Sequence, residues 1–317
     1  MMRAIAVTEY GAAPAVAEIR RPEPGPGQIL IKLRAAGMNP MDGLLASGAW
    51  RPMPATFPMV LGSDGAGVVE QLGEGASRFS VGERLFGQLL IAPIGSAGTY
   101  AEYVNAPEDA PLARVPNGLD DVVAAALPTA GMTGLALVEL LEPVAGKTVL
   151  IVGAGGGVGS FATQFVANAG GNVIATVRAD DAPRIRAYGA VETIDLESGA
   201  LPNAIRRAHP DGIDVLIDLV DDSAGFATLA SLVRPGGTAV TTRFAADEEG
   251  LLASGVTHVN FRLQERLSDG ILERVGDAVT QGRIVAPPIA RISLEEVPAA
   301  LDPALRRLAS GKTVILL

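Results

Sequence analysis

Residues 147–160 read Lys147-Thr148-Val149-Leu150-Ile151-Val152-Gly153-Ala154-Gly155-Gly156-Gly157-Val158-Gly159-Ser160. The apolar run 148–152 favours a buried strand, the glycines favour a tight turn, and residues 158–169 have helical character. Glycines suit such a turn because a pyrophosphate can approach the main chain closely only where side chains are missing. The start of the next helix adds unpaired N–H groups and a positive dipole end. The stretch therefore predicts a dinucleotide-binding site.

Two registers of the fingerprint G-x-G-x-x-G are possible in this loop. Counted from Gly153, the third glycine place falls on Val158, whereas the register that ends at Gly159 begins with alanine at its first place. We prefer the second register, which predicts these loop residues as cofactor-binding: Ala154, Gly156, Gly157, Val158 and Gly159. A merely flexible turn is the alternative, and the strand before and the helix after the loop argue against it.

The end of the next predicted strand, 172–177, indicates which dinucleotide binds. NAD sites usually place Asp or Glu there, about 20 residues beyond the glycines, to hold the ribose 2′-hydroxyl. This chain has Arg178, and a guanidinium can pair with a 2′-phosphate, so the predicted cofactor is NADP(H). Two alternatives stay open: Arg178 is a solvated loop residue, or Asp180 or Asp181 binds a ribose hydroxyl.

Composition excludes several other classes of protein. The chain has 317 residues, of which 48% are hydrophobic, which is enough for two domains with a large core. It has no cysteine, so disulfides, a thiolate nucleophile and a cysteine-ligated zinc are excluded. A net charge of −10 argues against a nucleic-acid partner. The first ten residues turn polar too soon for a signal peptide, and the apolar stretch 122–141 is broken by Pro128 and Glu139, so we expect a cytoplasmic protein with no membrane segment.

The pattern of elements changes near residue 120. Residues 1–120 contain short β patterns at 4–8, 28–35, 67–72 and 100–104, with helix signals nearly absent before Leu119, which predicts an irregular β domain. Residues 121–262 alternate helices with buried strands, which predicts a doubly wound parallel sheet. Residues 263–317 contain helical stretches near 269–281 and 294–308 and end in a β run, 313–317, that we expect to return to the first domain. The fold class is α/β.

Several segments together resemble the zinc-independent quinone oxidoreductase branch of the medium-chain dehydrogenase/reductase superfamily. Their order and spacing are more specific than any one of them, and they cover essentially the whole chain: 37–42, 60–69, 81–85, 98–103, 125–133, the glycine loop, 236–237 and 311–314. The resemblance implies a GroES-like N-terminal domain, to which the C-terminal segment returns, with a Rossmann domain between them and the substrate in the cleft.

The resemblance also indicates whether the chain has the ligands for a catalytic zinc ion. Zinc-dependent relatives carry a Gly-His-Glu motif that supplies a histidine ligand, and the matching place here reads Gly62-Ser63-Asp64. The only histidines, His209 and His258, lie in the nucleotide-binding half. We therefore predict no metal ligand and no alcohol oxidation through a zinc-bound alkoxide.

Without metal or thiolate, the predicted chemistry is hydride transfer from NADPH to an electron-poor C=C bond or a quinone. By resemblance, Asn39 lies near the nicotinamide and donates its amide N–H to the acceptor carbonyl, although Asn is also favoured as the cap of a turn before Pro40. Asp42 orients this loop or caps the next helical turn, with direct proton transfer as the alternative. Ser63 holds a water or the substrate oxygen, or is a structural hydroxyl.

Thr133 resembles the family threonine whose hydroxyl approaches the nicotinamide carboxamide or ribose, and the alternative is a helix threonine bonded to its own backbone. Quinone reductases often carry a tyrosine soon after the Asn-Pro-x-Asp motif, where this chain has Gly43, Leu44 and Leu45. Quinone reductases also tend to have a lysine early in the helix after the second strand and a tyrosine after the third strand, and Ala182 and Leu196 hold those places here. We therefore assign the phosphate contact to Arg178, with Arg184 or Arg186 in reserve. The missing tyrosine and the nearby Trp50 and Met53 favour a more apolar cleft mouth, although Trp50 can equally be loop packing.

The sequence thus predicts an NADPH-dependent, zinc-free reductase of quinones or α,β-unsaturated carbonyl compounds. The alternative from another class is a nucleotide-binding protein of this fold with little turnover, which serves in sensing or partner binding. By resemblance we also expect a homodimer, paired through the β-rich run 256–261 as the edge strand of the Rossmann sheet.

Overall fold

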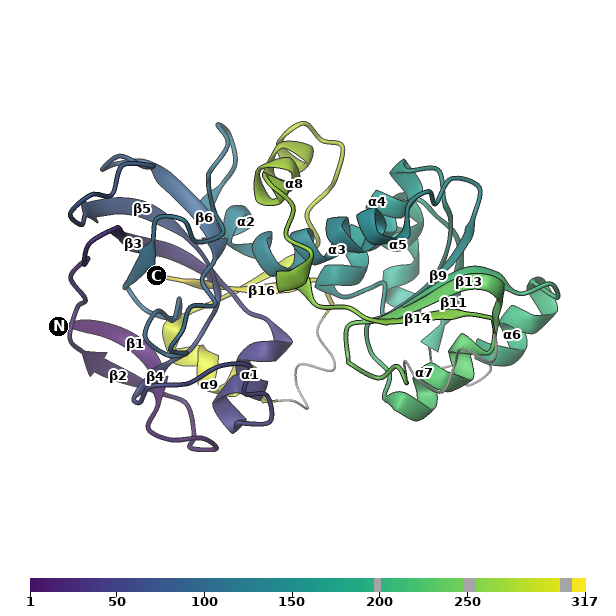
Figure 1. Cartoon of the computed structure of the whole chain (residues 1–317), viewed down its shortest axis with the longest axis horizontal. Helices are drawn as coiled ribbons and strands as arrows, with labels where there is room; N and C mark the ends of the chain where they lie inside the picture. Colours follow the sequence, from purple (N-terminus) through teal and green to yellow (C-terminus); the bar gives the residue numbers. More distant parts are fainter. Residues whose placement is uncertain (197–200, 248–254, 303–309) are drawn as a thin grey trace. The chain divides into compact units, whose positions relative to one another are not determined.

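The computed structural model describes residues 1–196, 201–247, 255–302 and 310–317. It divides into two compact units, Met1–Thr129 with Leu272–Leu317, and Ala130–Ile271 (Figure 1). The sequence-based boundaries at 120 and 262 each lie nine residues before these limits. The first unit carries the irregular β structure, and the second carries the parallel sheet.

The first unit is built mainly of short strands. Within the described residues these are β1 (Met2–Val7), β2 (Ala15–Ile19), β3 (Gln28–Gly37), β4 (Met59–Val60), β5 (Asp64–Leu72), β6 (Arg84–Gln88), β7 (Tyr103–Pro107), β8 (Leu112–Arg114), β15 (Ile289–Ile292) and β16 (Lys312–Leu316). One sheet has the order β15-β16-β3-β5-β6-β8, with β7 paired to β3, and a smaller one has the order β2-β1-β4.

The last strand, β16, pairs antiparallel with β3, with Val314 opposite Gly37 and Leu316 opposite Ala35. In Figure 1 the yellow β16 accordingly runs beside strands of the N-terminal segment. Val314 and Ile315 are fully buried, which is why the apolar run at the end of the chain needs a partner sheet. This pairing brings residues from the two ends of the chain into one core.

Helices of the first unit are short and lie between the strands or after them. They are α1 (Pro40–Ser47), α2 (Asp121–Ala126), α8 (Ile271–Thr280, which starts at the unit boundary) and α9 (Val297–Ala300), with a 3-10 turn η5 (Leu294–Glu296). The sequence pattern missed α1. Pro40 at its start and Gly48 in the left-handed conformation at its end fit the usual helix termini, but eight residues with Gly43 inside give a weak periodic signal.

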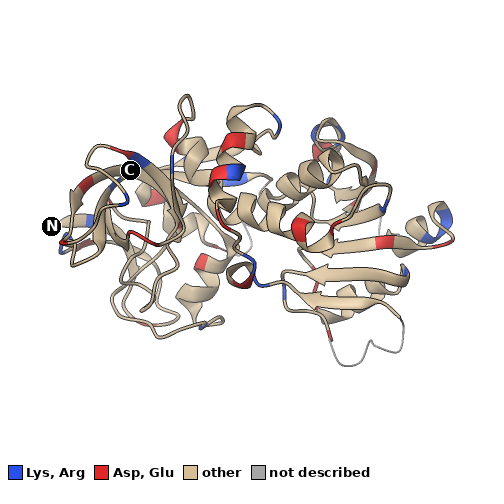
Figure 2. Cartoon of the chain, turned by 45° about the horizontal axis from the view of Figure 1, so that its top comes forward, with Lys and Arg blue, Asp and Glu red and all other residues tan. Residues whose placement is uncertain are grey.

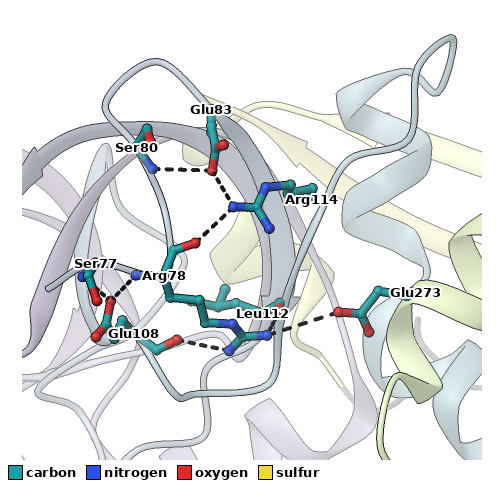
Figure 3. A network of polar contacts seen from close by, with 8 residues as sticks. All are labelled: Ser77, Arg78, Ser80, Glu83, Glu108, Leu112, Arg114 and Glu273. Carbon is teal, nitrogen blue, oxygen red and sulfur yellow. Dashed lines mark hydrogen bonds and ion pairs between the residues drawn. The ribbon is translucent and has the colours of Figure 1, made fainter.

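An arginine network fastens the loops that precede β6 and β8 (Figure 3). Arg78 donates from its guanidinium to the carbonyl oxygens of Glu108 and Leu112 at 2.9 and 2.8 Å. The Glu108 carboxylate in turn accepts the backbone N–H groups of Ser77 and Arg78, both at 2.6 Å. These bonds satisfy backbone groups of the two loops and of Leu112 at the start of β8, so they stabilise the irregular chain beside this strand.

The second unit alternates strands and helices. It contains β9 (Thr148–Val152), β10 (Asn172–Val177), β11 (Ala190–Asp195), β12 (Ile213–Asp218), β13 (Val233–Thr241) and β14 (Thr257–Asn260), with α4 (Gly157–Asn168), α5 (Ala182–Ala187), α6 (Leu201–Ala208), α7 (Ser223–Ala230) and the 3-10 turns η1 (Ala179–Asp181) and η4 (Leu263–Glu265). Helix α3 (Pro128–Leu141) begins two residues before the unit boundary and continues into this unit.

All pairings in this sheet are parallel, in the order β11-β10-β9-β12-β13-β14. The central strands are apolar almost throughout, and β12 is buried at every position, as expected when helices cover both faces. The order of strands reverses at β9, so the crevice beyond the carboxyl end of β9 is where such sheets bind ligands. This confirms the predicted α/β fold with a Rossmann-type sheet.

The predicted helix 294–308 differs from the structure at its start, where η5 is followed by the short α9; residues 303–309 lie outside the described part of the chain.

Acidic and basic residues are interspersed over both units (Figure 2). Within the described residues, no helix has the length and hydropathy needed to cross a lipid bilayer.

Candidate active site

The glycine loop follows β9 at the point where the strand order reverses. Gly153 has a φ of +86°, a left-handed conformation that a side chain would strain, and it turns the chain out of the sheet. Helix α4 begins at Gly157, with Gly156 as its N-cap. The first N–H groups of α4 therefore lie in the loop, where they can bind phosphate oxygens.

The glycines at 156 and 159 have different surroundings. A Cβ built on Gly159 would lie 2.3 Å from the carbonyl oxygen of Gly153 and 2.6 Å from the Cα of Ala154, so only glycine lets the helix approach the loop here. At Gly156 the nearest atom would be 3.5 Å away, so a side chain fits within the protein but would cover the main chain. Ala154 is fully buried, whereas Gly157 and Val158 are half-buried. The close approach at Gly159 is what the register that ends at this residue requires of its third glycine.

The end of β10 brings charged residues to the glycine loop. Arg178 follows the strand directly and is half-buried. Arg184 of α5 donates to the Ser160 hydroxyl at 3.0 Å and to the Gly155 carbonyl oxygen at 3.1 Å, and it forms an ion pair with Asp181 at 2.6 Å. Arg184 therefore braces the loop and pairs with Asp181.

Thr133, the remaining residue predicted at the cofactor, lies in α3 and is only 6% exposed. The next residue, Gly134, faces α4, where a Cβ would lie 2.7 Å from the Cβ of Phe161. This close helix contact fixes Thr133 in the second unit together with the glycine loop.

In the first unit the structure brings Asn39, Asp42 and Ser63 together. The Asp42 carboxylate accepts the backbone N–H of Asn39 at 2.7 Å, which fixes the start of α1. The Asn39 side-chain Nδ2 donates to the Ser63 hydroxyl at 3.4 Å. Asn39 is 4% exposed, Ser63 1%, and Asp42 is fully buried. The three predicted residues therefore form one contiguous polar group inside the β domain.

Lys312, the first residue of β16, completes this group and was missed by the sequence reasoning. Its ammonium nitrogen donates to the Asn39 Oδ1 and to the Met38 carbonyl oxygen, both at 2.7 Å, and the residue is 6% exposed. The available signal was a lysine at the edge of an apolar run at the end of the chain. Such lysines are usually solvated, so sequence pattern alone does not single it out.

Four further side chains extend the cluster: Asp64, Thr129, Gln88 and Tyr100. The Asp64 carboxylate accepts the backbone N–H of Thr129 at 3.0 Å and its hydroxyl at 2.6 Å, and that hydroxyl also accepts from Gln88 Nε2 at 2.7 Å. The Tyr100 hydroxyl donates to the Asp42 carboxylate at 2.5 Å. We call the eight residues Asn39, Asp42, Ser63, Asp64, Gln88, Tyr100, Thr129 and Lys312 the buried polar cluster.

Burial shifts the pKa values of the ionisable groups in this cluster. It raises the pKa of Asp42 to about 6, against the lowering by the hydrogen bonds from Tyr100 and Asn39. It raises the pKa of Asp64 too, which Lys312 and the bonds from Thr129 and Asn39 partly offset. Burial lowers the pKa of Lys312, and the charges of Asp64 and Asp42 act in the opposite direction. The cluster thus binds and releases protons away from the ordinary values of its groups.

A small cavity adjoins Asp42. Its lining is mostly apolar, with side chains such as Leu45, Met59, Leu61 and Ile94. Asp42 Oδ1 is buried and has no hydrogen-bond partner among the residues that the structure describes. One oxygen of Asp42 is therefore held by two donors, while the other lies in an apolar environment, which is the cause of the raised pKa.

The predicted cleft residues Trp50 and Met53 are both partly buried against an apolar core cluster of the first unit that includes Tyr100 and Leu301. The same cluster contains Leu45, one of the residues found where quinone reductases often have a tyrosine. At least part of each side chain therefore serves to pack this core.

The comparisons with known proteins agree with the fold. The family model of the alcohol dehydrogenase GroES-like domain matches residues 25–117, and that of the zinc-binding dehydrogenase matches residues 157–265. The chain is 36% identical over 250 residues to a quinone oxidoreductase of Pseudomonas aeruginosa, which covers 76% of this chain and 73% of the relative. It is 32% identical over 247 residues to a human quinone oxidoreductase, with 76% and 72% covered.

Solved structures are similar over the whole chain. A quinone oxidoreductase of Pseudomonas syringae pv. tomato matches with a TM-score of 0.88 at 25% identity and covers 100% of both chains. A mycobacterial protein solved in complex with NADPH matches with a TM-score of 0.87 at 28% identity, again with 100% of both chains covered.

These matches and the two-unit fold define the class: the chain belongs to the medium-chain dehydrogenase/reductase superfamily. Within it, the chain is a quinone oxidoreductase-like enzyme that depends on a nicotinamide cofactor. The resemblance noted in the sequence is thereby confirmed.

Proposed function

We propose that the protein is an NADPH-dependent reductase that works without zinc and transfers hydride to a quinone or an α,β-unsaturated carbonyl compound. The observation that carries the proposal is the buried polar cluster. At the place where zinc-dependent relatives hold a metal ligand, Ser63 lies against Asn39, and Asp64 is bound to Thr129. The ammonium of Lys312 takes part in the same cluster, and a positive charge there opposes a dication.

The donor set of the chain supports the absence of zinc. Zinc sites use cysteine, histidine and carboxylate ligands, and the chain has no cysteine. Its two histidines, His209 and His258, both belong to the second unit. Among the described residues, no three side chains of the metal-ligating types are grouped to hold a metal ion.

The cofactor preference is argued from the second unit. The close approach of α4 to the loop at Gly159 supports the binding of a dinucleotide pyrophosphate, and Arg178, directly after β10, is the residue that we assign to the 2′-phosphate. Arg184 braces the loop and pairs with Asp181, and it is the reserve candidate. The NADPH complex of the mycobacterial relative supports the same choice.

Bound nicotinamide supplies the hydride in this chemistry, and the residues of the chain bind and orient the reactants. As the acceptor gains negative charge, its carbonyl oxygen needs a hydrogen-bond donor, for which we assign Asn39 Nδ2 and the Ser63 hydroxyl. Asp42 fixes the backbone of Asn39 and is a positioning residue rather than the proton donor. The proton that completes the reduction comes from water.

The test is oxidation of NADPH by the purified protein with a panel of acceptors: 1,4-benzoquinone, 1,4-naphthoquinone, but-3-en-2-one and a long-chain enal. We expect turnover with at least one of these acceptors, insensitivity to chelators, and no stoichiometric zinc by metal analysis. Tight NADPH binding without turnover would instead support a nucleotide-binding protein with a sensing role. Stoichiometric, tightly held zinc would overturn the metal-free mechanism.

The role of Asn39 has a separate test. Asn39→Ala is expected to lower kcat at saturating NADPH by about 10-fold or more, because a donor to the developing negative charge is lost. Asn105→Ala is the matched control, since the Asn105 amide contacts the Glu23 carbonyl oxygen of the same unit and is outside the cluster. An unchanged kcat in Asn39→Ala would limit Asn39 to capping α1.

A further inference from the structure

Lys312 is a buried cation that the mechanism above does not yet use. Lys312 contacts the side chain of Asn39, although the two residues are 273 positions apart in the sequence. The antiparallel pairing of β16 with β3 places it there, because Val314 lies opposite Gly37, two residues before Asn39. A lysine in a protein core is costly unless hydrogen bonds and opposite charges compensate it. Both kinds of compensation are present.

The charges that face Lys312 come from two acids of different elements. Asp42 lies in α1, and Asp64 begins β5; each of them acts electrostatically on Lys312. Among the described residues, the Lys312 ammonium donates to Asn39 and Met38 and does not form a direct ion pair with either acid. The ammonium is thus directed at the amide of Asn39.

This contact fixes which way the Asn39 amide points. An ammonium group has donors only, so the Asn39 atom that faces it must be the oxygen Oδ1. The NH₂ group then faces Ser63, at 3.4 Å from its hydroxyl, and Asp64, with which the Asn39 side chain also forms a hydrogen bond. The ammonium and the Asp64 carboxylate thus hold the amide in one orientation, and loss of the ammonium removes one of these two constraints.

The contact also strengthens the donor. A cation that binds the amide oxygen draws electron density from the nitrogen, which makes each Nδ2–H a better donor to a negatively charged oxygen. We infer that Lys312 is a positioning residue that orients and polarises the Asn39 amide for the acceptor carbonyl. This inference rests on the proposed function, and it adds a residue from the last strand to the reductive chemistry.

The first experiment compares Lys312→Met with Asn39→Ala and with the double variant. Lys312→Met is expected to lower kcat by about 10- to 100-fold, while the KM for NADPH stays within about twofold because the glycine loop is untouched. If Lys312 acts through Asn39, the double variant is no slower than Asn39→Ala within about threefold. If the losses of kcat in the two single variants multiply in the double variant, the inference is overturned.

Lys32→Met is the matched control, because Lys32 is an exposed lysine on β3 of the same unit. Its kcat is expected to equal that of the wild type. Lys312→Gln is the conservative variant: it keeps an N–H donor near Asn39 but removes the charge, so its kcat should lie between those of the wild type and Lys312→Met. A kcat of Lys312→Gln equal to that of Lys312→Met would show that donation by residue 312 does not matter.

A second readout does not depend on turnover or on the Met variant folding. In protein labelled with ¹⁵N-asparagine, the side-chain amide of Asn39 is assigned by its disappearance in Asn39→Ala. We expect this signal to exchange slowly with solvent in the wild type, and to shift and exchange faster in Lys312→Gln. An unchanged signal would overturn the inference, whereas a changed signal in a protein that reduces no acceptor would overturn only the proposed function.

Discussion

Asp42 is a carboxyl group in the core of the first unit, with a pKa raised by burial to about 6 from the ordinary 3.8. A raised pKa means that the folded state favours the protonated acid. The stability that Asp42 contributes is therefore fully present below pH 3.8 and is lost as the pH rises through about 6. Relative to Asp42→Asn, the wild type is expected to lose roughly 1 to 1.5 kcal/mol of its free energy of unfolding between pH 5 and 7.

Urea unfolding of the two proteins across that pH range measures this difference. Asp109→Asn serves as the control, because Asp109 is an exposed residue of the same unit. The free energy of unfolding of the wild type minus that of Asp42→Asn should fall between pH 5 and 7. If this value stays constant or increases with pH, the raised pKa of Asp42 is contradicted.

Arg178 decides the cofactor preference if it binds the 2′-phosphate. Arg178→Ala is expected to raise the Kd for NADPH by about 10-fold or more and to leave that for NADH unchanged, since only NADPH carries the phosphate. Fluorescence titration with each dinucleotide measures both constants. Arg207→Ala, at an exposed position of α6, is the control. Equal binding of NADH and NADPH by the wild type would instead favour Asp180 or Asp181 as ribose ligands.

At the scale of elements, the glycine loop must let α4 approach closely and must leave its main chain open to the cofactor. Separate variants can distinguish these two requirements. Gly159→Ala puts a Cβ against the Gly153 carbonyl oxygen and the Ala154 Cα, so α4 must move away from the loop. We expect a loss of roughly 1–3 kcal/mol in the free energy of unfolding, together with weaker NADPH binding. Gly156→Ala has room for its methyl group, so it should retain stability and lose affinity only.

Denaturation and fluorescence titration of both variants give the two quantities side by side. If Gly156→Ala binds NADPH as tightly as the wild type, the main chain at Gly156 is not in contact with the pyrophosphate. If Gly159→Ala is as stable as the wild type, the close approach of α4 to the loop is not needed.

At the scale of the whole molecule, we predict a homodimer formed through β14, an edge strand of the parallel sheet. Light scattering of the purified protein at micromolar concentration should give the mass of a dimer. Thr257→Lys, at an exposed position of β14, is expected to shift this equilibrium towards monomer without loss of fold, because a charged residue on an edge strand opposes pairing. A wild-type monomer at this concentration would contradict the prediction.

Much of the fold follows from local patterns along the chain. The alternation of buried strands with helices after residue 120 predicted the parallel sheet, and the run 148–152 before the glycines predicted β9, because both signals depend on neighbouring residues only. The short elements β2, β4, β6, β8 and α1 escaped prediction, since two to eight residues carry little periodic signal and form here through contacts with distant strands.

The candidate sites show the same division. By itself the sequence determined the glycine loop, Arg178 after β10, the lack of cysteine ligands and the Asn-Pro-x-Asp segment, because each lies within one short stretch. Only the tertiary structure decided that Asn39, Ser63, Tyr100 and Lys312 form one buried polar cluster. The physical reason is that the β16–β3 pairing and the hydrogen bonds of Asp42 join residues from opposite ends of the chain, and no local pattern encodes which distant partner satisfies a buried charge.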